Sequence, residues 1–424
     1  MKRAPIRGWY RGYVLGVLFL VYVCAFLDRH ILYILAEPIQ QELEIPDRIL
    51  GLLYGPAFAI LYALLGLLVA RWADRGVRRS IIALGLVVWS ALTAASGLAR
   101  SAVQLAAARI GVGMGQAACS PPAHSLISDL FPPGRRATAL AIYSMGIHAG
   151  ILISYALGGF LRDEVGWREA FLWVGLPGLL LALVLRFTVR EPQRGHAEGR
   201  LDTGEPLALG VAVRSMARLR SFRHLAAGAA LNSLVGYALS AWLPLFLDRV
   251  HAMKDGAELG LSLGLVLGVG GAAGTLAGGI LGDRLGARDP RWQLRIPALA
   301  TFASFPFTAA ALLWPTRLGA LLLLVPAILL GYLYLGPVFA LTQGLVPLRL
   351  RAFAAATLIF LMNIVGLALG PAAVGMVSDL LGSHAGLGAA ALRYALLIAV
   401  VGRLWAAVHL WIGSRTLAAE LRSA

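Results

Sequence analysis

The sequence predicts an all-α integral membrane protein with twelve transmembrane helices arranged as two six-helix pseudo-symmetric halves. Three observations support this fold class. Hydrophobic residues make up 59% and charged residues 14% of the 424 residues, against about 25% charged residues in soluble proteins. Apolar runs of bilayer-spanning length recur along the chain, and basic residues gather in alternate connecting segments. With a mean hydropathy of +0.77, too little polar surface is left to coat a soluble enzyme, a soluble scaffold or a disordered protein.

Each element follows from the length of an apolar run, because a helix that crosses the bilayer needs about 20 mostly apolar residues. The first run follows a basic N-terminus, but it is too long for a signal peptide and further spans come after it, so we expect an uncleaved transmembrane helix. The predicted spans are residues 11–35, 49–72, 80–99, 102–128, 138–161, 169–189, 223–247, 258–282, 295–314, 317–346, 352–380 and 388–412.

One long polar segment divides these spans into two groups of six. We expect an N-terminal six-helix bundle at residues 1–189, a cytoplasmic linker at 190–222 and a C-terminal six-helix bundle at 223–424. Within the linker, residues 207–222 have the pattern of a basic amphipathic helix that lies on the membrane surface.

The formal charge of +16 and the pI of about 10.7 are values often seen in nucleic-acid-binding proteins. The positions of the charges give another explanation. With the N-terminus inside, 26 of the 37 basic residues fall in segments predicted to be cytoplasmic, 8 in outer segments, and 3 within spans. This is the positive-inside pattern. It predicts a multi-pass protein of the plasma (inner) membrane with both termini cytoplasmic and no nucleic-acid partner.

Similar residues recur in the two halves. The Asp74-Arg75 pair follows the second span and the Asp283-Arg284 pair follows the eighth, 209 residues later. Span five carries Gly146 and Gly150, and span eleven carries Gly366 and Gly370, which lie 220 residues further along. The chain therefore reads as a six-plus-six repeat.

These loops resemble the major facilitator superfamily over the whole chain. Residues 279–286 match its G-x-L-x-D-R-x-G signature, whereas the first loop has Ala70 in place of the usual glycine. The resemblance implies a cytoplasmic gate formed by Asp74, Arg75, Asp283 and Arg284. The alternative is that these charges serve only to orient the chain in the membrane.

Two further glycine patterns bear on coupling. Span four, from Arg109 to Ala117, resembles the R-x-x-x-G-x-G-x-A motif, which is associated with ion coupling in the superfamily. Span five resembles the antiporter motif only in part, because Ile151 stands where proline is usual. The sequence therefore adds little support for antiport.

Ionisable residues inside the predicted spans are candidates for function, because charge at membrane depth is costly. Asp28 and Arg29 lie about 25 Å along the first span, at 1.5 Å per residue, and Arg109 of span four falls at a similar depth. We expect Asp28 to carry the coupling proton, and Arg29 and Arg109 to bind an anionic group. The alternative is a buried structural ion pair.

Further polar residues complete the predicted substrate site. Gln116 lies on span four, His30 on span one, and Asn232 and Asn363 on spans seven and eleven. A structural role for His30 stays open. Arg403 on span twelve either lines the cavity or extends towards the cytoplasm.

The Asp-Arg pair on span one, together with Arg109, resembles the Spinster branch of the superfamily, which is associated with lysolipids and sphingolipid-type phosphates. Where that branch commonly has an acidic residue on span four, this chain has Gln116. Asp28 is then the main acidic candidate.

The resemblance implies a monomeric, proton-coupled secondary transporter that moves an amphiphilic anion by alternating access in the bilayer. An organic-anion or sugar-acid symporter, a drug exporter, and a non-transporting receptor on the same fold are the alternatives. We find no nucleophile–base set, zinc motif or paired catalytic carboxylates in the spans, so no enzyme activity, cofactor or metal is expected.

Overall fold

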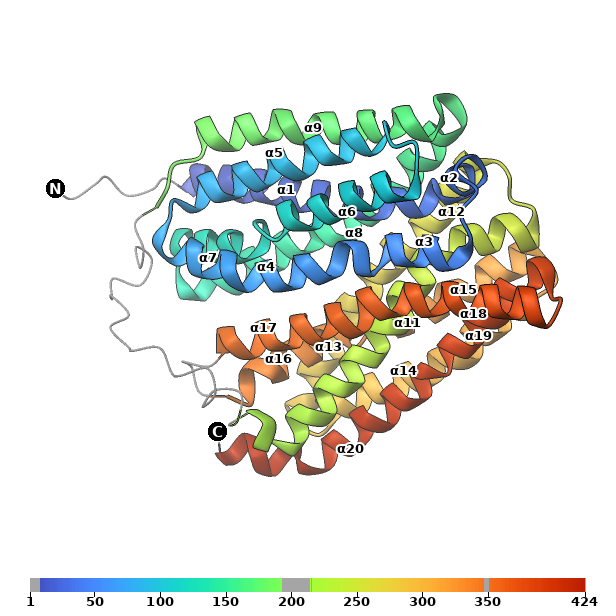
Figure 1. Ribbon diagram of the computed structural model, residues 1–424. Helices are drawn as coiled ribbons and strands as arrows, with labels where there is room; N and C mark the ends of the chain where they lie inside the picture. The colour runs from blue at the N-terminus through green and yellow to red at the C-terminus, as the bar shows by residue number, and fades with distance from the viewer. Residues whose placement is uncertain (1–7, 193–213, 215, 347–350, 424) are drawn as a thin grey trace. The chain divides into compact units, whose positions relative to one another are not determined.

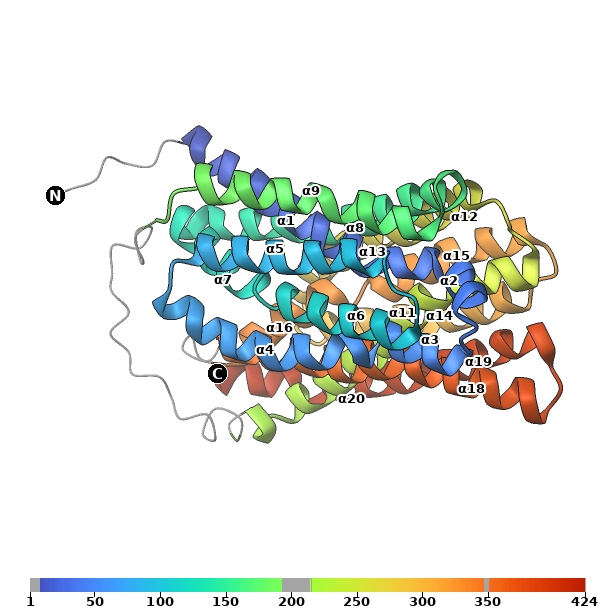
Figure 2. The same cartoon turned by 45° about the horizontal axis from the view of Figure 1, so that its top comes forward.

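The structure is a computed structural model that describes residues 8–192, 214, 216–346 and 351–423. Within these residues the regular elements are helices, and no strand is present. Eleven helical stretches are long and apolar enough to cross a membrane. Figure 1 shows the helices in chain order, and Figure 2 shows the same ribbon from a second direction. The chain is a multi-pass membrane protein of the predicted class.

The predicted fourth span differs from the others because it is not one helix. Helix α6 (Ala102–Gln116) ends at Gln116, and α7 (Ser120–Leu130) begins three residues later. Pro121 and Pro122 lie in the first turn of α7, where their missing N–H groups cost nothing. The expectation of one continuous helix over residues 102–128 is therefore wrong, and this break explains why the count of long apolar helices is eleven.

The chain forms two compact units. Unit 1 contains Met1–Glu44, Ala57–Thr203 and Asp255–Gly264, and unit 2 contains Ile45–Pro56, Gly204–Lys254 and Leu265–Ala424. The units differ from the two predicted halves by one short segment each: residues 45–56 pack in unit 2, and residues 255–264 pack in unit 1. The predicted surface helix at 207–222 lies mostly outside the described residues.

In unit 1, α1 packs against α8, α5 packs against α6 and α9, and the short α12 packs against α8. The helices of this unit are α1 (Gly8–Ile34), α2 (Ala36–Leu43), α4 (Pro56–Arg75), α5 (Arg78–Ser96), α6, α7, α8 (Pro133–Glu164), α9 (Gly166–Thr188) and α12 (Gly256–Leu263).

In unit 2, α11 packs against α20, α14 packs against α15 and α20, and the short α3 packs against α18. Two stretches, η1 and η3, are π-helical. The elements are α3 (Asp47–Tyr54), α11 (Arg220–His251), η1 (Gly264–Val269), α13 (Gly270–Gly286), α14 (Trp292–Leu313), α15 (Arg317–Tyr332), α16 (Leu335–Gly344), α17 (Arg351–Leu361), η3 (Met362–Leu369), α18 (Gly370–His384), η4 (Gly388–Ala390), α19 (Ala391–Val400) and α20 (Gly402–Ser423).

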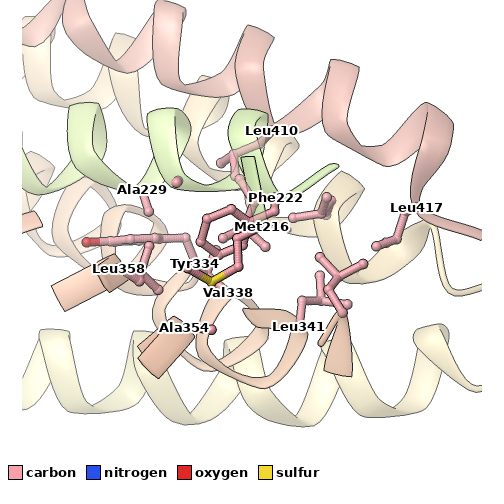
Figure 3. Close-up of a cluster of buried hydrophobic side chains, with 14 of the residues drawn as sticks. Met216, Phe222, Ala229, Tyr334, Val338, Leu341, Ala354, Leu358, Leu410 and Leu417 are labelled. Atoms are coloured by element: carbon pink, nitrogen blue, oxygen red, sulfur yellow. The ribbon is translucent and has the colours of Figure 1, made fainter. Parts of the chain in front are cut away.

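An apolar cluster joins the ends of several unit 2 helices. Met216 and Phe222 lie beside Tyr334 and Val338, and Leu410 of α20 closes the cluster (Figure 3). All five side chains are at most 5% exposed. The cluster therefore anchors the start of α11 to α16 and α20.

Close contacts between helices depend on glycine. Gly274 and Gly278 are one turn apart on α13 and face α15, and a β-carbon at these positions would overlap the carbonyl oxygens of Leu329 and Leu333. Small residues four apart let two helix backbones approach closely in a membrane protein. Gly279, the neighbour of Gly278, faces open space.

This contrast gives a prediction about stability. Gly278→Ala should destabilise the protein by about 1–3 kcal/mol, because the new methyl group forces α13 and α15 apart. Gly279→Ala should be neutral or stabilising by up to about 1 kcal/mol, because alanine is the better helix former. Thermal unfolding in detergent measures both variants. Equal unfolding temperatures for the two would contradict the close packing described here.

Candidate functional site

Three consecutive polar residues of α1 lie inside unit 1. Asp28, Arg29 and His30 are 1%, 3% and 2% exposed. Successive side chains on a helix point about 100° apart, so the three reach different neighbours. Buried polar groups need hydrogen-bond partners, because leaving a donor or acceptor unsatisfied costs about 1–3 kcal/mol.

Helix α6 supplies two of those partners. Gln116 accepts a hydrogen bond of 3.1 Å from Nη2 of Arg29 and donates one of 3.0 Å to the carbonyl oxygen of Ala25. Arg109 donates from Nη1 to the carbonyl oxygen of Asp28 at 3.1 Å and from Nη2 to that of Arg29 at 3.5 Å. Arg109 and Gln116 are seven residues apart, two helical turns, so one face of α6 lies along α1.

Aromatic rings surround the Arg29 guanidinium. Its central carbon lies 4.6 Å from the ring centre of Phe26, 4.7 Å from that of Phe58 and 5.0 Å from that of Tyr62. Phe58 also lies 5.2 Å from the guanidinium carbon of Arg109. Such cation–π contacts stabilise a desolvated guanidinium by about 2 kcal/mol each. We call Asp28, Arg29, Arg109, Gln116 and these three rings the unit 1 polar site.

The Asp28 carboxyl group points away from the Arg109 hydrogen bonds. Arg109 binds the main-chain oxygen of Asp28, and one carboxyl oxygen is buried without a hydrogen-bond partner among the described residues. Thr93 and Trp89 of α5 are the neighbouring side chains whose hydroxyl and indole N–H groups can donate to this carboxyl. Asp28 is therefore held beside a cation while its carboxyl group keeps free acceptor capacity.

His30 does not join the unit 1 polar site. Its Nδ1 lies 2.9 Å from the carbonyl oxygen of Phe26, and its ring packs 5.1 Å from Tyr33 and 6.1 Å from Tyr155 between ring centres. The structure thus places His30 in aromatic packing towards α8. This environment matches the structural role that the sequence left open.

Asn232 belongs to a separate polar cluster in unit 2. Its Nδ2 donates to the carbonyl oxygen of Gly331 at 3.2 Å and to Oγ1 of Thr301 at 3.4 Å. Arg403, 2% exposed, donates to Oγ of Ser304 and, at 3.2 Å, to the carbonyl oxygen of Ala327. Arg403 thus lies inside the bundle and does not extend towards the cytoplasm.

Asn363 lies in the π-helical segment η3 and is 7% exposed. The neighbouring Ser233 of α11 donates to the carbonyl oxygen of Met362 at 3.2 Å, and Gly366 packs against the Ser233 side chain. Single π-helical turns often mark functional positions. Ser233, which sequence reasoning missed, therefore supports the turn that presents Asn363.

The predicted gate residues are described only in part. The side chains of Asp74 and Arg75 lie outside the described residues, and Asp283 and Arg284 are exposed near the end of α13. The basic tail of the first loop is better defined. Arg78 is fully buried, and it binds the carboxylates of Asp129 and Glu191, the latter at 2.7 Å.

The aromatic part of the unit 1 polar site was missed by sequence reasoning. Phe58 and Tyr62 lie one turn apart on α4, and their rings stack 5.3 Å apart. Their spacing of four places them on one face of a helix, but an aromatic pair in an apolar span is also ordinary packing. Only the position of Arg29 gives the pair a role.

Comparison with known proteins agrees with this architecture. The family model of the Major Facilitator Superfamily matches residues 18–371. An MFS-type efflux pump of Mycolicibacterium smegmatis (strain ATCC 700084 / mc(2)155) is 36% identical over 420 residues, which are 97% of this chain and 94% of that protein.

The fold is also similar to solved structures of a bacterial homolog to the human lysosomal transporter Spinster. The inward-facing, unoccupied structure has a TM-score of 0.88 and 33% identity, and covers 98% of this chain and 99% of that chain. The inward-facing, occupied structure has a TM-score of 0.85 and 33% identity, and covers 97% and 98%.

Two shorter matches come from different branches. A hexuronate transporter of Bacillus subtilis (strain 168) is 31% identical over 42% of this chain and 43% of its own length. The sphingosine-1-phosphate transporter SPNS2 of Danio rerio is 27% identical over 57% of this chain and 49% of its own length. These homologues are transporters and not enzymes. The chain therefore belongs to the major facilitator superfamily of membrane transporters and is related to its Spinster proteins.

Proposed function

We propose that this protein is a proton-coupled secondary transporter that moves an amphiphilic anion, a lysophospholipid or a sphingosine-phosphate-like molecule, by alternating access in the plasma membrane as a monomer. One observation carries the proposal. Two buried guanidinium groups, those of Arg29 and Arg109, lie against a buried carboxyl group, that of Asp28, within one helical bundle.

The two arginines fit an anionic head group. Arg109 uses two of its five N–H donors on main-chain carbonyl oxygens, and Gln116 and the aromatic rings are among the partners of Arg29. A phosphate forms charge-assisted hydrogen bonds with guanidinium groups that are about twice as strong as neutral ones. A phosphate can therefore replace the amide contact without loss of binding energy.

The carboxyl group of Asp28 supplies the coupling. While Asp28 is ionised, it offsets part of the positive charge of the neighbouring arginines and so competes electrostatically with an anionic substrate. Protonation of Asp28 removes that competition, and the substrate and the proton then favour each other's binding by the same factor. Gln116 cannot take this role because an amide does not titrate.

The amphiphilic part of the proposal rests on two supports. Three aromatic rings beside Arg29 provide an apolar surface next to the charged position. The similar structures and the Danio rerio relative bear Spinster and sphingosine-1-phosphate names. Asn232 and Asn363 are proposed as polar contacts of the second bundle. The loops with Asp74, Arg75, Asp283 and Arg284 are proposed as the cytoplasmic gate.

A sugar-acid symporter is the second candidate, because the match to a hexuronate transporter shares the requirement for a bound anion. A drug exporter is favoured by the full-length match to an efflux pump. Uptake into proteoliposomes of a labelled lysophospholipid, of glucuronate and of a cationic dye separates the three. Binding without turnover of any probe would indicate a receptor.

Coupling predicts a specific effect of one variant. In wild-type proteoliposomes, a pH gradient should change the rate of lysophospholipid uptake. Asp28→Asn should carry substrate with no response to the gradient, because its side chain does not bind the proton. The exposed acid of Glu164→Gln is the matched control and should keep the response. An unchanged pH response in Asp28→Asn would refute coupling through this residue.

Head-group recognition predicts a loss of affinity. Arg29→Gln and Arg109→Gln should each weaken lysophospholipid binding about 10- to 150-fold, the range expected for about 1.5–3 kcal/mol from a hydrogen bond to a charged group. The ligand-induced rise in unfolding temperature measures binding. Arg288→Gln removes an exposed arginine and should bind normally. Normal binding by both buried variants would exclude this head-group site.

A further inference from the structure

Two short helices begin at a carboxylate that comes from another helix. Asp379 of α18 accepts hydrogen bonds from the main-chain N–H groups of Asp47, at 3.1 Å, and Arg48, at 3.0 Å, at the start of α3. In unit 1, Asp163 of α8 accepts hydrogen bonds from the N–H groups of Gly256, at 2.6 Å, and Ala257, at 3.1 Å, at the start of α12.

Both positions suit a carboxylate. The first N–H groups of a helix lack partners within the helix and carry the positive end of its dipole. The N-cap residue of α3 is Pro46, which has no side-chain cap bond, so Asp379 takes that role from a different helix. In α12 the local cap Asp255 binds the N–H of Glu258 at 2.8 Å, and Asp163 binds two others.

Directly below each carboxylate the two helices cross at glycine. In unit 2, a β-carbon on Gly375 would overlap the carbonyl oxygen of Asp47, and one on Gly51 would lie 2.7 Å from that of Pro371. In unit 1, a β-carbon on Gly159 would overlap the carbonyl oxygen of Gly256, and one on Gly260 would overlap that of Tyr155.

The two crossings are related by the internal repeat. Gly159 and Asp163 correspond to Gly375 and Asp379, each 216 residues later, and the pair Gly51 and Gly55 corresponds to Gly260 and Gly264, each 209 residues later. The same carboxylate, at the same four-residue distance from the same glycine, thus meets the same helix start in both units. The agreement of four positions makes a chance contact an inadequate explanation.

The unit 2 crossing has additional bonds. Arg249 of α11 donates to both carboxyl oxygens of Asp47, at 2.9 Å each, and Ser378 donates to Oδ2 of Asp47 at 2.7 Å. These bonds hold the first residue of α3 from two further directions. The α3 crossing is therefore the more strongly held of the two.

We propose that Asp163 and Asp379 are a matched pair of latches that hold α12 on α8 and α3 on α18, and that both latches release when the transporter opens on that side. Residues 45–56 and 255–264 each pack in the unit opposite to their own six-span half. The predicted topology places all four helix ends outside. The proposal rests on the alternating access of the proposed function, but not on its substrate.

The test measures conformation directly. In a background without Cys24 and Cys119, spin labels at Val103 and Leu318, both exposed and predicted to lie outside, report the outer separation by pulsed spin-resonance spectroscopy. Asp163→Ala and Asp379→Ala should each raise the ratio of long-distance to short-distance populations about fivefold, the change expected from the loss of a helix cap. The double variant should raise it about 25-fold, because the two sites are distant.

Asp255→Ala is the matched control, because it removes a cap of α12 that comes from the same segment and should leave the distances unchanged. A second label pair within unit 1, at Val103 and Phe160, must keep its wild-type distance, which shows that the bundle remains folded. Unchanged outer distances in the double variant would overturn the latch. Since no substrate is added, a transporter of a different substrate would still show the effect.

Discussion

The interior of each bundle depends on one constraint: a polar side chain removed from water must find a partner, and in a helical membrane protein the nearest acceptors are main-chain carbonyl groups. Arg109 and Gln116 donate to carbonyl oxygens of α1, and Asn232 and Arg403 donate to carbonyl oxygens of α15. Each long polar side chain thereby fixes one helix against another. Because helix carbonyls satisfy Arg109, the Asp28 carboxyl group is not consumed in a closed ion pair, which leaves it available to titrate.

Much of the fold could be predicted because the bilayer imposes a single length on its helices. Eleven predicted spans coincide with long apolar helices, and the exception arises where Pro121 and Pro122 restart the chain after α6. The neighbourhood of Asp28 and Arg109 followed from depth alone, since two helices that cross the same membrane place equal depths side by side. Depth does not give direction around a helix, so the hydrogen bonds to carbonyl oxygens and the separation of His30 from the other polar residues required the structure.

Contacts between residues distant in sequence were less accessible. The aromatic rings of Phe58 and Tyr62 gain their role from the position of Arg29, which no periodicity encodes. The exchange of α3 and α12 between the units was hidden for a similar reason, because α3 and α4 read as one apolar run. Gly55 separates them, and a single glycine within an apolar run does not announce that the two parts belong to different units.

The two capped crossings show why such contacts suit a protein that must separate and rejoin its helices. Apolar side chains give little preference for helix over lipid, because lipid tails are equally apolar, and a deep interdigitated contact would resist separation by virtue of its shape. A glycine crossing brings smooth backbones together, and the carboxylate at its end supplies the specificity. When the helices part, water can take over the hydrogen bonds of both the carboxylate and the helix N–H groups at the membrane surface, so no buried group is left unsatisfied. The energy of closure is thus concentrated in a few bonds whose alternative partner, water, reaches the same place only in the open state.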